Sequence, residues 1–183
     1  MKRINISPTD LSKFFWNKIL ENSFIKSEIY KKDFFSKIDS LEKLRLESEY
    51  NTGSISSTSS WLLYSLVIFF KPKTIIEIGS FIGKSTISMA LGADDYIDEH
   101  KCEIFCCDMS NDIKLPQLSK TKITQFNKTK SIDMLKNLDG NMSFDLIHVD
   151  GRLENEDFEI LKRNINERTV FVLDDFEGKE KGV

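Results

Sequence analysis

The residues Thr74–Leu91, T-I-I-E-I-G-S-F-I-G-K-S-T-I-S-M-A-L, decide the fold of this chain. The first five residues are a short run rich in β-branched side chains, which predicts a buried strand. Gly79 and Gly83 interrupt the run, and the apolar residues after them fit a helix better than a strand. A strand, a glycine turn and a helix that begins at once bring backbone N–H groups and the positive end of a helix dipole together. The stretch therefore predicts a binding site for a carboxylate or phosphate group.

The glycine spacing distinguishes three kinds of nucleotide site. The dinucleotide fingerprint G-x-G-x-x-G needs a glycine where this chain has Phe81, so that motif is absent. The P-loop G-x-x-x-x-G-K-[ST] matches only at its end, Gly83–Thr86, because three residues separate the glycines where the phosphate cradle needs four. The segment Glu77–Gly83 resembles, at each defined position, the E-x-G-x-x-x-G loop of class I methyltransferases that use S-adenosylmethionine (SAM).

The charge of Glu77 favours the third motif over the P-loop. We expect this carboxylate at the mouth of the loop, where a triphosphate would meet a like charge. SAM instead carries an ammonium and a sulfonium, which a carboxylate attracts. The alternative for Glu77 is a solvated acid at the end of a strand.

Composition predicts a single globular domain. The chain has 183 residues, and its 40% hydrophobic and 30% charged residues are ordinary values for a protein that buries a core. A formal net charge of −3 argues against a nucleic-acid partner. The N-terminus lacks the apolar core of a signal peptide, and the longest apolar run, Trp61–Phe70, is too short to span a bilayer. Cys102, Cys106 and Cys107 match no zinc spacing, so we expect reduced core thiols in a cytoplasmic protein without a membrane partner.

Helical and strand patterns alternate along the chain, which predicts an α/β fold. We expect N-terminal helices, a doubly wound, mostly parallel, Rossmann-like sheet and helices on both of its faces. The expected domains are an N-terminal helical region, residues 1–52, and the sheet domain, residues 53–183. The expected helices cover 7–19, 27–46, 58–70, the region ending near 91, the region beginning at 131, and 153–165; the expected strands cover 74–78, 102–107, 122–127, 144–149 and 169–173.

Acidic residues stand where the predicted strands end. Asp108 follows the second strand about 30 residues after the glycine loop, where doubly wound folds place the acceptor for ribose hydroxyls. Asp150 follows the fourth strand, and Asp174 and Asp175 follow the fifth. Ligands of such sheets bind outside the carboxyl ends of the strands. Each aspartate alone could simply form a turn, but together with Glu77 they predict a cleft that prefers a cation.

From Gly53 to Gly178, about two thirds of the chain, the order of segments resembles a class I SAM-dependent methyltransferase. Within that class it resembles the small-molecule O-methyltransferase branch related to catechol, caffeoyl-CoA and macrocin-type enzymes. The segments that carry the resemblance are E-I-G-S-F-I-G-K-S-T, C-C-D, S-I-D-M-L, F-D-L-I-H-V-D-G and V-F-V-L-D-D. The resemblance implies transfer of a methyl group from SAM to an oxygen of a small molecule.

The resemblance also implies a role for individual residues. Asp108 would accept the ribose hydroxyls, Ser131 would lie beside the adenine, and Asp150 would serve both cofactor binding and catalysis. The residues that would hold the methionine part of SAM are Glu77, Gly79, Ser80, Gly83 and Ser85.

A divalent cation is a further implication of the resemblance. In metal-dependent members, acids that match Asp150, Asp174 and Asp175 bind the ion, and oxygen ligands alone suit Mg²⁺, Mn²⁺ or Ca²⁺. Two departures bear on this prediction. Many relatives carry a histidine where this chain has Leu153, and His148 is a strand residue expected to pack in the sheet. The chain also ends soon after the fifth strand, so we expect either a fragment or a sheet edge that another chain or the N-terminal helices cover.

Two other functions remain open at this stage. One is a P-loop-like nucleotide-binding protein, with Lys84 on phosphate and Asp174 on Mg²⁺. The other is a non-catalytic module with the SAM-binding fold that works by pairing with a partner, which the replaced histidine and the short C-terminus favour. For the enzyme, the expected partners are a small-molecule acceptor and, in a homodimer, a second copy of the chain.

Overall fold

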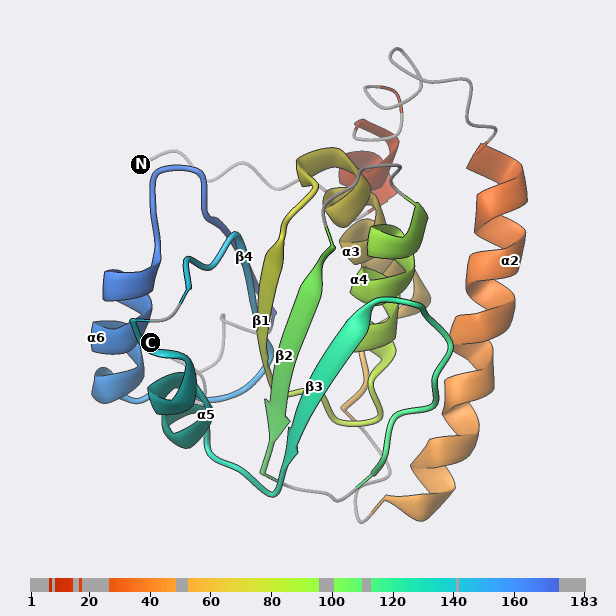
Figure 1. The fold of residues 1–183 in the computed structure, drawn as a ribbon. Coiled ribbons are helices and arrows are strands. Elements are labelled where there is room, and N and C mark those ends of the chain that lie inside the picture. Colours follow the sequence, from red (N-terminus) through yellow and green to blue (C-terminus); the bar gives the residue numbers. More distant parts are fainter. Residues whose placement is uncertain are drawn as a thin grey trace.

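The computed structural model describes residues 7, 9–14, 17, 27–48, 53–95, 101–109, 113–140 and 142–174. One sheet of parallel strands forms the centre of the molecule, and helices cover both of its faces (Figure 1). The strands are β1 (Thr74–Ile78), β2 (Glu103–Asp108), β3 (Lys122–Asn127), β4 (Leu146–Val149) and β5 (Val170–Leu173). All five predicted strands are present, with ends that differ from the prediction by no more than two residues.

The strand order β3-β2-β1-β4-β5 confirms the doubly wound sheet. Every neighbouring pair is parallel, and β1 lies between β2 and β4. The chain first winds outward from β1 through β2 to β3, and then returns to the other side of β1 to form β4 and β5. The switch point therefore lies at the carboxyl ends of β1 and β4, where open α/β sheets bind their ligands.

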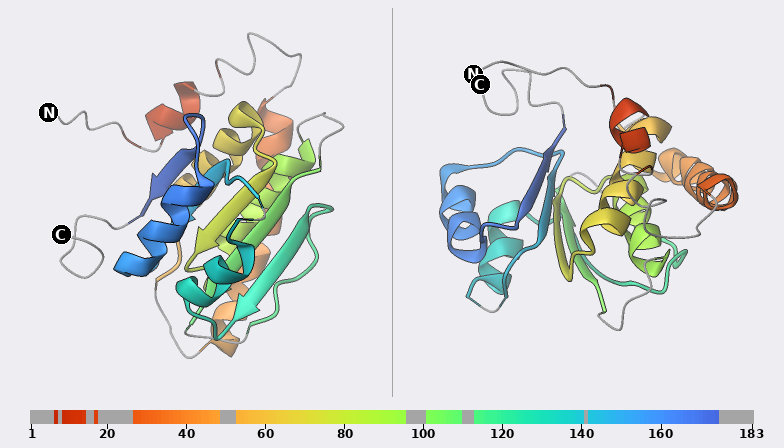
Figure 2. Two further views of the ribbon diagram at one scale, coloured as in Figure 1. Left: turned by 60° about the vertical axis from the view of Figure 1, so that its left-hand side comes forward. Right: turned by 90° about the horizontal axis from the view of Figure 1, so that it is seen from above.

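The helices form two layers around the sheet (Figures 1 and 2). One layer contains α2 (Ser27–Ser40), α3 (Ser57–Phe70) and α4 (Lys84–Asp95), and the other contains α5 (Ser131–Leu138) and α6 (Asn155–Asn164). Successive strand residues point to opposite faces, so Ile75 packs in the core beneath α3 and α4 while Ile76 packs in the core beneath α5 and α6. The strand β1, which leads into the glycine loop at residues 79–83, is therefore packed on both faces.

The second N-terminal helix ends earlier than the sequence pattern predicted. Its apolar periodicity continues to residue 46, but α2 ends at Ser40 and the 3₁₀ helix η1 (Leu41–Glu47) follows. The Ser40 hydroxyl donates a hydrogen bond to the Lys37 carbonyl at 2.6 Å, a local bond that competes with α-helical hydrogen bonding. The tighter 3₁₀ winding then changes the direction in which the polar side chains of η1 point.

The N-terminal helices share a core with the sheet domain. Phe34 and Leu41 are buried in one cluster with Trp61 and Tyr64 of α3. The Trp61 and Tyr64 rings stack with their centroids 4.8 Å apart, a geometry typical of packed aromatic cores. The boundary at residue 52 stays a prediction, but the two regions are in direct contact.

Within the described residues, β5 is the edge strand opposite β3, and it exposes Phe171 and Leu173. Whether another chain or the N-terminal helices cover this edge stays a prediction, and residues 175–183 lie outside the described residues. Among the helices that the structure describes, none has the length and apolar character needed to cross a bilayer.

Candidate functional site

The loop between β1 and α4 crosses the end of β2. Gly79 N and Ser80 N donate hydrogen bonds to the Cys107 carbonyl, at 2.9 and 3.1 Å, and Gly83 N donates to the Ser80 carbonyl at 2.7 Å. These bonds fix the loop to the strand beside it. The loop then enters α4 at Lys84, so the predicted strand–turn–helix is confirmed.

Gly79 is required by both conformation and space. Its φ is +92°, a backbone conformation that residues with a side chain rarely adopt. A Cβ at this position would lie 2.8 Å from the carbonyl carbon of Asp150 and 2.9 Å from its oxygen. The backbones that leave β1 and β4 therefore approach as closely as a glycine allows.

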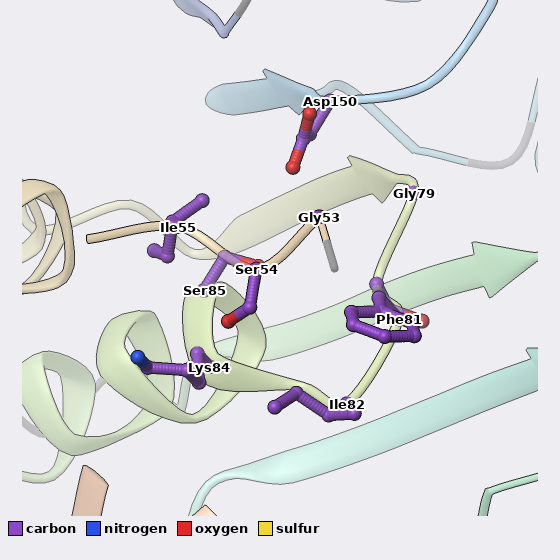
Figure 3. A pocket seen from close by; sticks show the side chains of 10 residues that line it. Gly53, Ser54, Ile55, Gly79, Phe81, Ile82, Lys84, Ser85 and Asp150 are labelled. Carbon is purple, nitrogen blue, oxygen red and sulfur yellow. The ribbon is translucent and has the colours of Figure 1, made fainter. Parts of the chain in front are cut away.

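Two hollows meet at this point, and both are lined by Gly79 and Asp150. The larger has a volume of about 270 Å³, just below the range of roughly 300–1,000 Å³ typical of small-molecule sites. The smaller lies against the start of α4 (Figure 3). Besides the shared pair, the larger hollow is lined by Ile78, Cys107, Asp108, Met109, Thr129, Ser131, Gly151 and Arg152, and the smaller by Gly53, Ser54, Ile55, Ser80, Phe81, Ile82, Lys84 and Ser85.

The larger hollow brings together four of the predicted residues: Gly79, Asp108, Ser131 and Asp150. Asp108 is only 8% exposed, and its Oδ2 accepts a hydrogen bond of 2.7 Å from Phe81 N in the glycine loop. The Ser131 hydroxyl donates to Asp157 Oδ2 of α6 at 2.9 Å, which holds the start of α5 against the hollow. Because the Phe81 N–H of the glycine loop bonds directly to Asp108, a ligand that contacts Asp108 would also lie beside this loop.

The smaller hollow contains Gly79, Ser80, Ser85 and Asp150 of the predicted set. Figure 3 shows Asp150 pointing into it from the β4 side, with Ser54 and Ser85 on the opposite side. The predicted residue Gly83 closes the turn beneath, at φ +79°, where a Cβ would overlap the Leu115 side chain at 2.2 Å.

Glu77 does not lie at the mouth of the loop, so that part of the prediction is wrong. Its side chain has no exposed surface and lies beneath the loop, in the sheet. Thr86 Oγ1 donates a hydrogen bond to Glu77 Oε2, and His148 Nδ1 lies 3.1 Å from Oε1. Glu77 and His148 are register partners on β1 and β4, which confirms that His148 packs in the sheet. Direct contact between Glu77 and a ligand stays a prediction.

Two of the three acids in the predicted cation site, Asp150 and Asp174, are among the described residues. Asp174 N donates to the Val149 carbonyl at 2.9 Å, so Asp174 and Asp150 end neighbouring strands. Asp175 lies outside the described residues. In the part of the chain that the structure describes, no group of three His, Cys, Asp or Glu side chains could hold a metal ion. The two described aspartates alone do not make a metal centre.

The geometry of Lys84 argues against the P-loop alternative. Its Nζ forms an ion pair of 2.8 Å with Glu42 Oε1 of η1, and the residue is 7% exposed. Figure 3 shows its amino end directed away from Gly79 and Phe81. The lysine that a P-loop would place on a phosphate is therefore engaged elsewhere.

The sequence pattern did not indicate that Gly53–Ile55 would line the site. These residues precede α3. Ser56 caps the N-terminus of this helix by accepting a hydrogen bond of 3.0 Å from Ser59 N. The buried Oγ atoms of Ser54 and Ser80 have no hydrogen-bond partner among the described residues, although the Cys106 thiol lies near the Ser80 hydroxyl. A polar ligand in this hollow would supply a partner for the Ser54 hydroxyl, and buried polar groups are nearly always satisfied. The serine-rich stretch by itself predicts only a loop and a helix cap.

Comparison with known proteins gives one family and a set of similar structures. Residues 76–176 match the family described as "Methyltransferase domain". Among curated proteins, none matches this sequence significantly.

Three solved structures illustrate the structural likeness. An O-methyltransferase from Bacillus cereus, in complex with S-adenosylhomocysteine (SAH), has a TM-score of 0.58 and 18% identity, over 75% of this chain and 65% of that one. The O-methyltransferase TomG from Streptomyces achromogenes, involved in tomaymycin synthesis and in complex with SAM, has a TM-score of 0.56 and 19% identity, over 74% of this chain and 63% of that one. The SAH-bound methyltransferase PaMTH1 from Podospora anserina has a TM-score of 0.58 and 18% identity, over 95% of this chain and 73% of that one. At these identities the likeness shows a shared fold, and the chain spans less than two thirds of the first two structures.

Proposed function

This chain belongs to the Methyltransferase domain family, and from that premise we propose that it binds SAM and transfers its methyl group to an oxygen of a small molecule. The observation that carries the proposal is the pair of hollows joined at Gly79 and Asp150. A ligand that is polar at both ends and cationic between them matches the polarity and charge of the groups that line the two hollows.

The larger hollow suits the adenosine part of SAM. Asp108 is an acceptor for the ribose hydroxyls, and its bond to Phe81 N orients the carboxylate before any ligand arrives. Ser131 and Met109 line the same hollow and would lie beside the base. A preorganised acceptor of this kind reduces the ordering that binding requires.

The smaller hollow suits the methionine part. The start of α4 offers backbone N–H groups and a positive dipole end to the carboxylate. The Ser54 hydroxyl is a buried polar group to which the ligand would supply a partner. Asp150 lies where the two hollows meet, so its carboxylate would lie near the sulfonium. Opposite charges at this junction favour the cationic cofactor over its neutral thioether product.

When bound, SAM supplies a methyl group that an oxygen nucleophile can attack as the carbon–sulfur bond breaks. The contribution of this chain would be alignment, since holding two reactants in line removes much of the entropic barrier. In this proposal Asp150, at the junction, would accept the proton of the acceptor hydroxyl. The position at which many relatives carry a histidine is Leu153, which packs against the core beneath α5 and α6 and offers no base.

Calorimetric titration with SAM, SAH and ATP tests the proposal. We expect SAM and SAH to bind in the micromolar range. Asp108→Asn should lose about 10- to 100-fold in affinity, since hydrogen bonds to a charged group contribute roughly 1.5–3 kcal/mol. Asp133→Asn, an exposed acid in the first turn of α5, is the matched control and should bind as the wild type does. Binding of ATP without SAM would contradict the proposal and restore the P-loop alternative. An acceptor screen with methyl-labelled SAM then tests the transfer itself.

A non-catalytic SAM-binding module is the second candidate, and the replacement of the usual base by Leu153 favours it. SAM binding without transfer to any acceptor, together with a stable complex with a second copy or another protein in light scattering, is the result that would support it.

A further inference from the structure

The first residue of α4 is a buried cation in an unfavourable place. Lys84 opens the helix with its side chain only 8% exposed. A positive charge at a helix N-terminus opposes the helix dipole, and burial adds a desolvation penalty. A lysine in this position requires a compensating negative charge nearby.

Glu42 of η1 supplies that charge. Its Oε1 lies 2.8 Å from Lys84 Nζ, and its Oε2 accepts a hydrogen bond of 2.9 Å from Arg45 Nε. The hydrogen bonds from Arg45 and Lys84 lower the pKa of Glu42 to about 2, so the carboxylate is ionised at every physiological pH. One carboxylate thus joins two cations that belong to different parts of the chain.

Arg45 contacts the glycine loop at residues 79–83. Its guanidinium lies over the Phe81 ring, 5.9 Å from the centroid, within the range of a cation–π interaction. Phe81 has a φ of +43°, which few residues with a side chain adopt, so its conformation depends on the groups that hold it. Its backbone N–H is the donor to Asp108, and both Phe81 and Lys84 line the smaller hollow.

η1 itself has a firm attachment to the core. Leu41 is 1% exposed and packs with Ile87 and Leu91 of α4. Glu42 and Arg45 therefore project over the loop from a fixed base. Their contacts act on the loop from a segment about 40 residues earlier in the chain.

We propose that Glu42 is a positioning residue for the SAM loop: through Lys84 and Arg45 it holds the start of α4 and Phe81 in the arrangement that binds the methionine end of the ligand. This inference rests on the proposed function. Glu42 does not line either hollow, so it acts through its two partners and not by touching the ligand.

The experiment is a titration of SAH into the full chain and into three variants. Glu42→Gln keeps the size of the side chain and removes its charge, and we expect the Kd for SAH to rise about 3- to 10-fold. Glu42→Asp keeps the charge and should recover part of the loss. Glu47→Gln, an exposed acid at the end of the same 3₁₀ helix, is the matched control and should leave the Kd unchanged.

A double-mutant cycle with Lys84→Met tests whether Glu42 acts through its partner. In the Lys84→Met background, Glu42→Gln should raise the Kd by a smaller factor than it does in the wild type, because only the contact with Arg45 remains to be broken. Arg45→Met should itself weaken binding, which provides a second variant if Lys84→Met folds poorly.

Three outcomes would overturn the inference. Glu42→Gln could bind SAH as tightly as Glu47→Gln does, with or without a lower Tm, which would leave a structural role only. The effects of Glu42→Gln and Lys84→Met could multiply in full, which would exclude action through the lysine. Absence of SAH binding by the wild type would overturn the proposed function and this inference together, and that measurement precedes the others.

Discussion

The close approach of the chain segments that leave β1 and β4 makes Gly79→Ala the most informative substitution. The added Cβ would lie 2.8 Å from the carbonyl carbon of Asp150, whereas ordinary contacts begin at about 3.4 Å. The obstacle is backbone, so no side-chain rotation relieves it. Either the loop or the segment at Asp150–Gly151 must move by several tenths of an ångström.

The expected loss of stability has two parts. A side chain at positive φ costs roughly 1–2 kcal/mol, and the reduced entropy of the unfolded chain offsets about 0.4–1 kcal/mol of this. The backbone overlap adds roughly 1–3 kcal/mol, the usual cost of overpacking. The sum is about 1–5 kcal/mol, and at roughly 2–4 °C per kcal/mol for a chain of this length it lowers the Tm by roughly 2–20 °C.

Two other glycines separate these parts. Gly140 has a φ of +72°, and a Cβ added there would meet nothing within 4 Å, so Gly140→Ala measures the conformational part alone, about 1 kcal/mol. Gly151 lacks a positive φ, and its Cβ would meet Ile78 Cγ2 at 3.1 Å, so Gly151→Ala measures a mild contact next to the site. Gly140 does not line either hollow, and its substitution should leave SAH binding unchanged.

Urea unfolding gives the free energies, and titration with SAH gives the affinities. We expect Gly79→Ala to be clearly less stable than Gly140→Ala and to bind SAH at least about tenfold more weakly, because both hollows share the displaced residues. If Gly79→Ala matches Gly140→Ala in both measurements, the close approach of β1 and β4 does not exist as described and the reasoning fails.

Three further predictions rest on single groups. Burial raises the pKa of Cys107 to about 12 and that of Cys106 well above its usual value. Iodoacetamide at pH 8 should therefore leave both thiols unmodified in the native protein. Labelling of either cysteine at the rate of a denatured control, measured by mass spectrometry, would contradict this. The pKa of Glu42 is lowered from 4.5 to about 2, chiefly by its hydrogen bond from Arg45, so its contribution to stability is complete above about pH 4.5 and disappears as the pH falls toward 2. Glu42→Gln should flatten the pH dependence of the urea midpoint in that window, and an unchanged slope would refute the assignment. If a divalent cation binds at Asp150, Asp174 and Asp175, Mg²⁺, Mn²⁺ or Ca²⁺ should raise the Tm and Asp174→Asn should abolish the rise; no response of the Tm or of methyl transfer to any of the three ions rules the cation out.

The sequence was sufficient for the elements whose pattern is local. The run Thr74–Ile78 is rich in β-branched residues because β1 is buried on both faces. A continuous run of this kind is typical of a central parallel strand. The glycine spacing and Asp108 identified the loop and its acid because each lies immediately after a strand. The apolar residues that share one face of α2 and of α3 also pack together in one core cluster, as helical periodicity requires.

The contacts that join distant segments were not predictable in the same way, because each depends on strand order or on helix packing. Glu77 was expected to face the ligand since it precedes the glycine loop, but the pairing of β1 with β4 places His148 beside it and buries both. Ser54 joins the hollow only because α3 packs beside α4, and the charge on Glu42 matters only because α2 gives way to a 3₁₀ helix at Ser40. In each case the residue type was ordinary and its partner lay more than 20 residues away. A motif therefore locates the site in this fold, whereas the residues that orient the motif come from the packing around it.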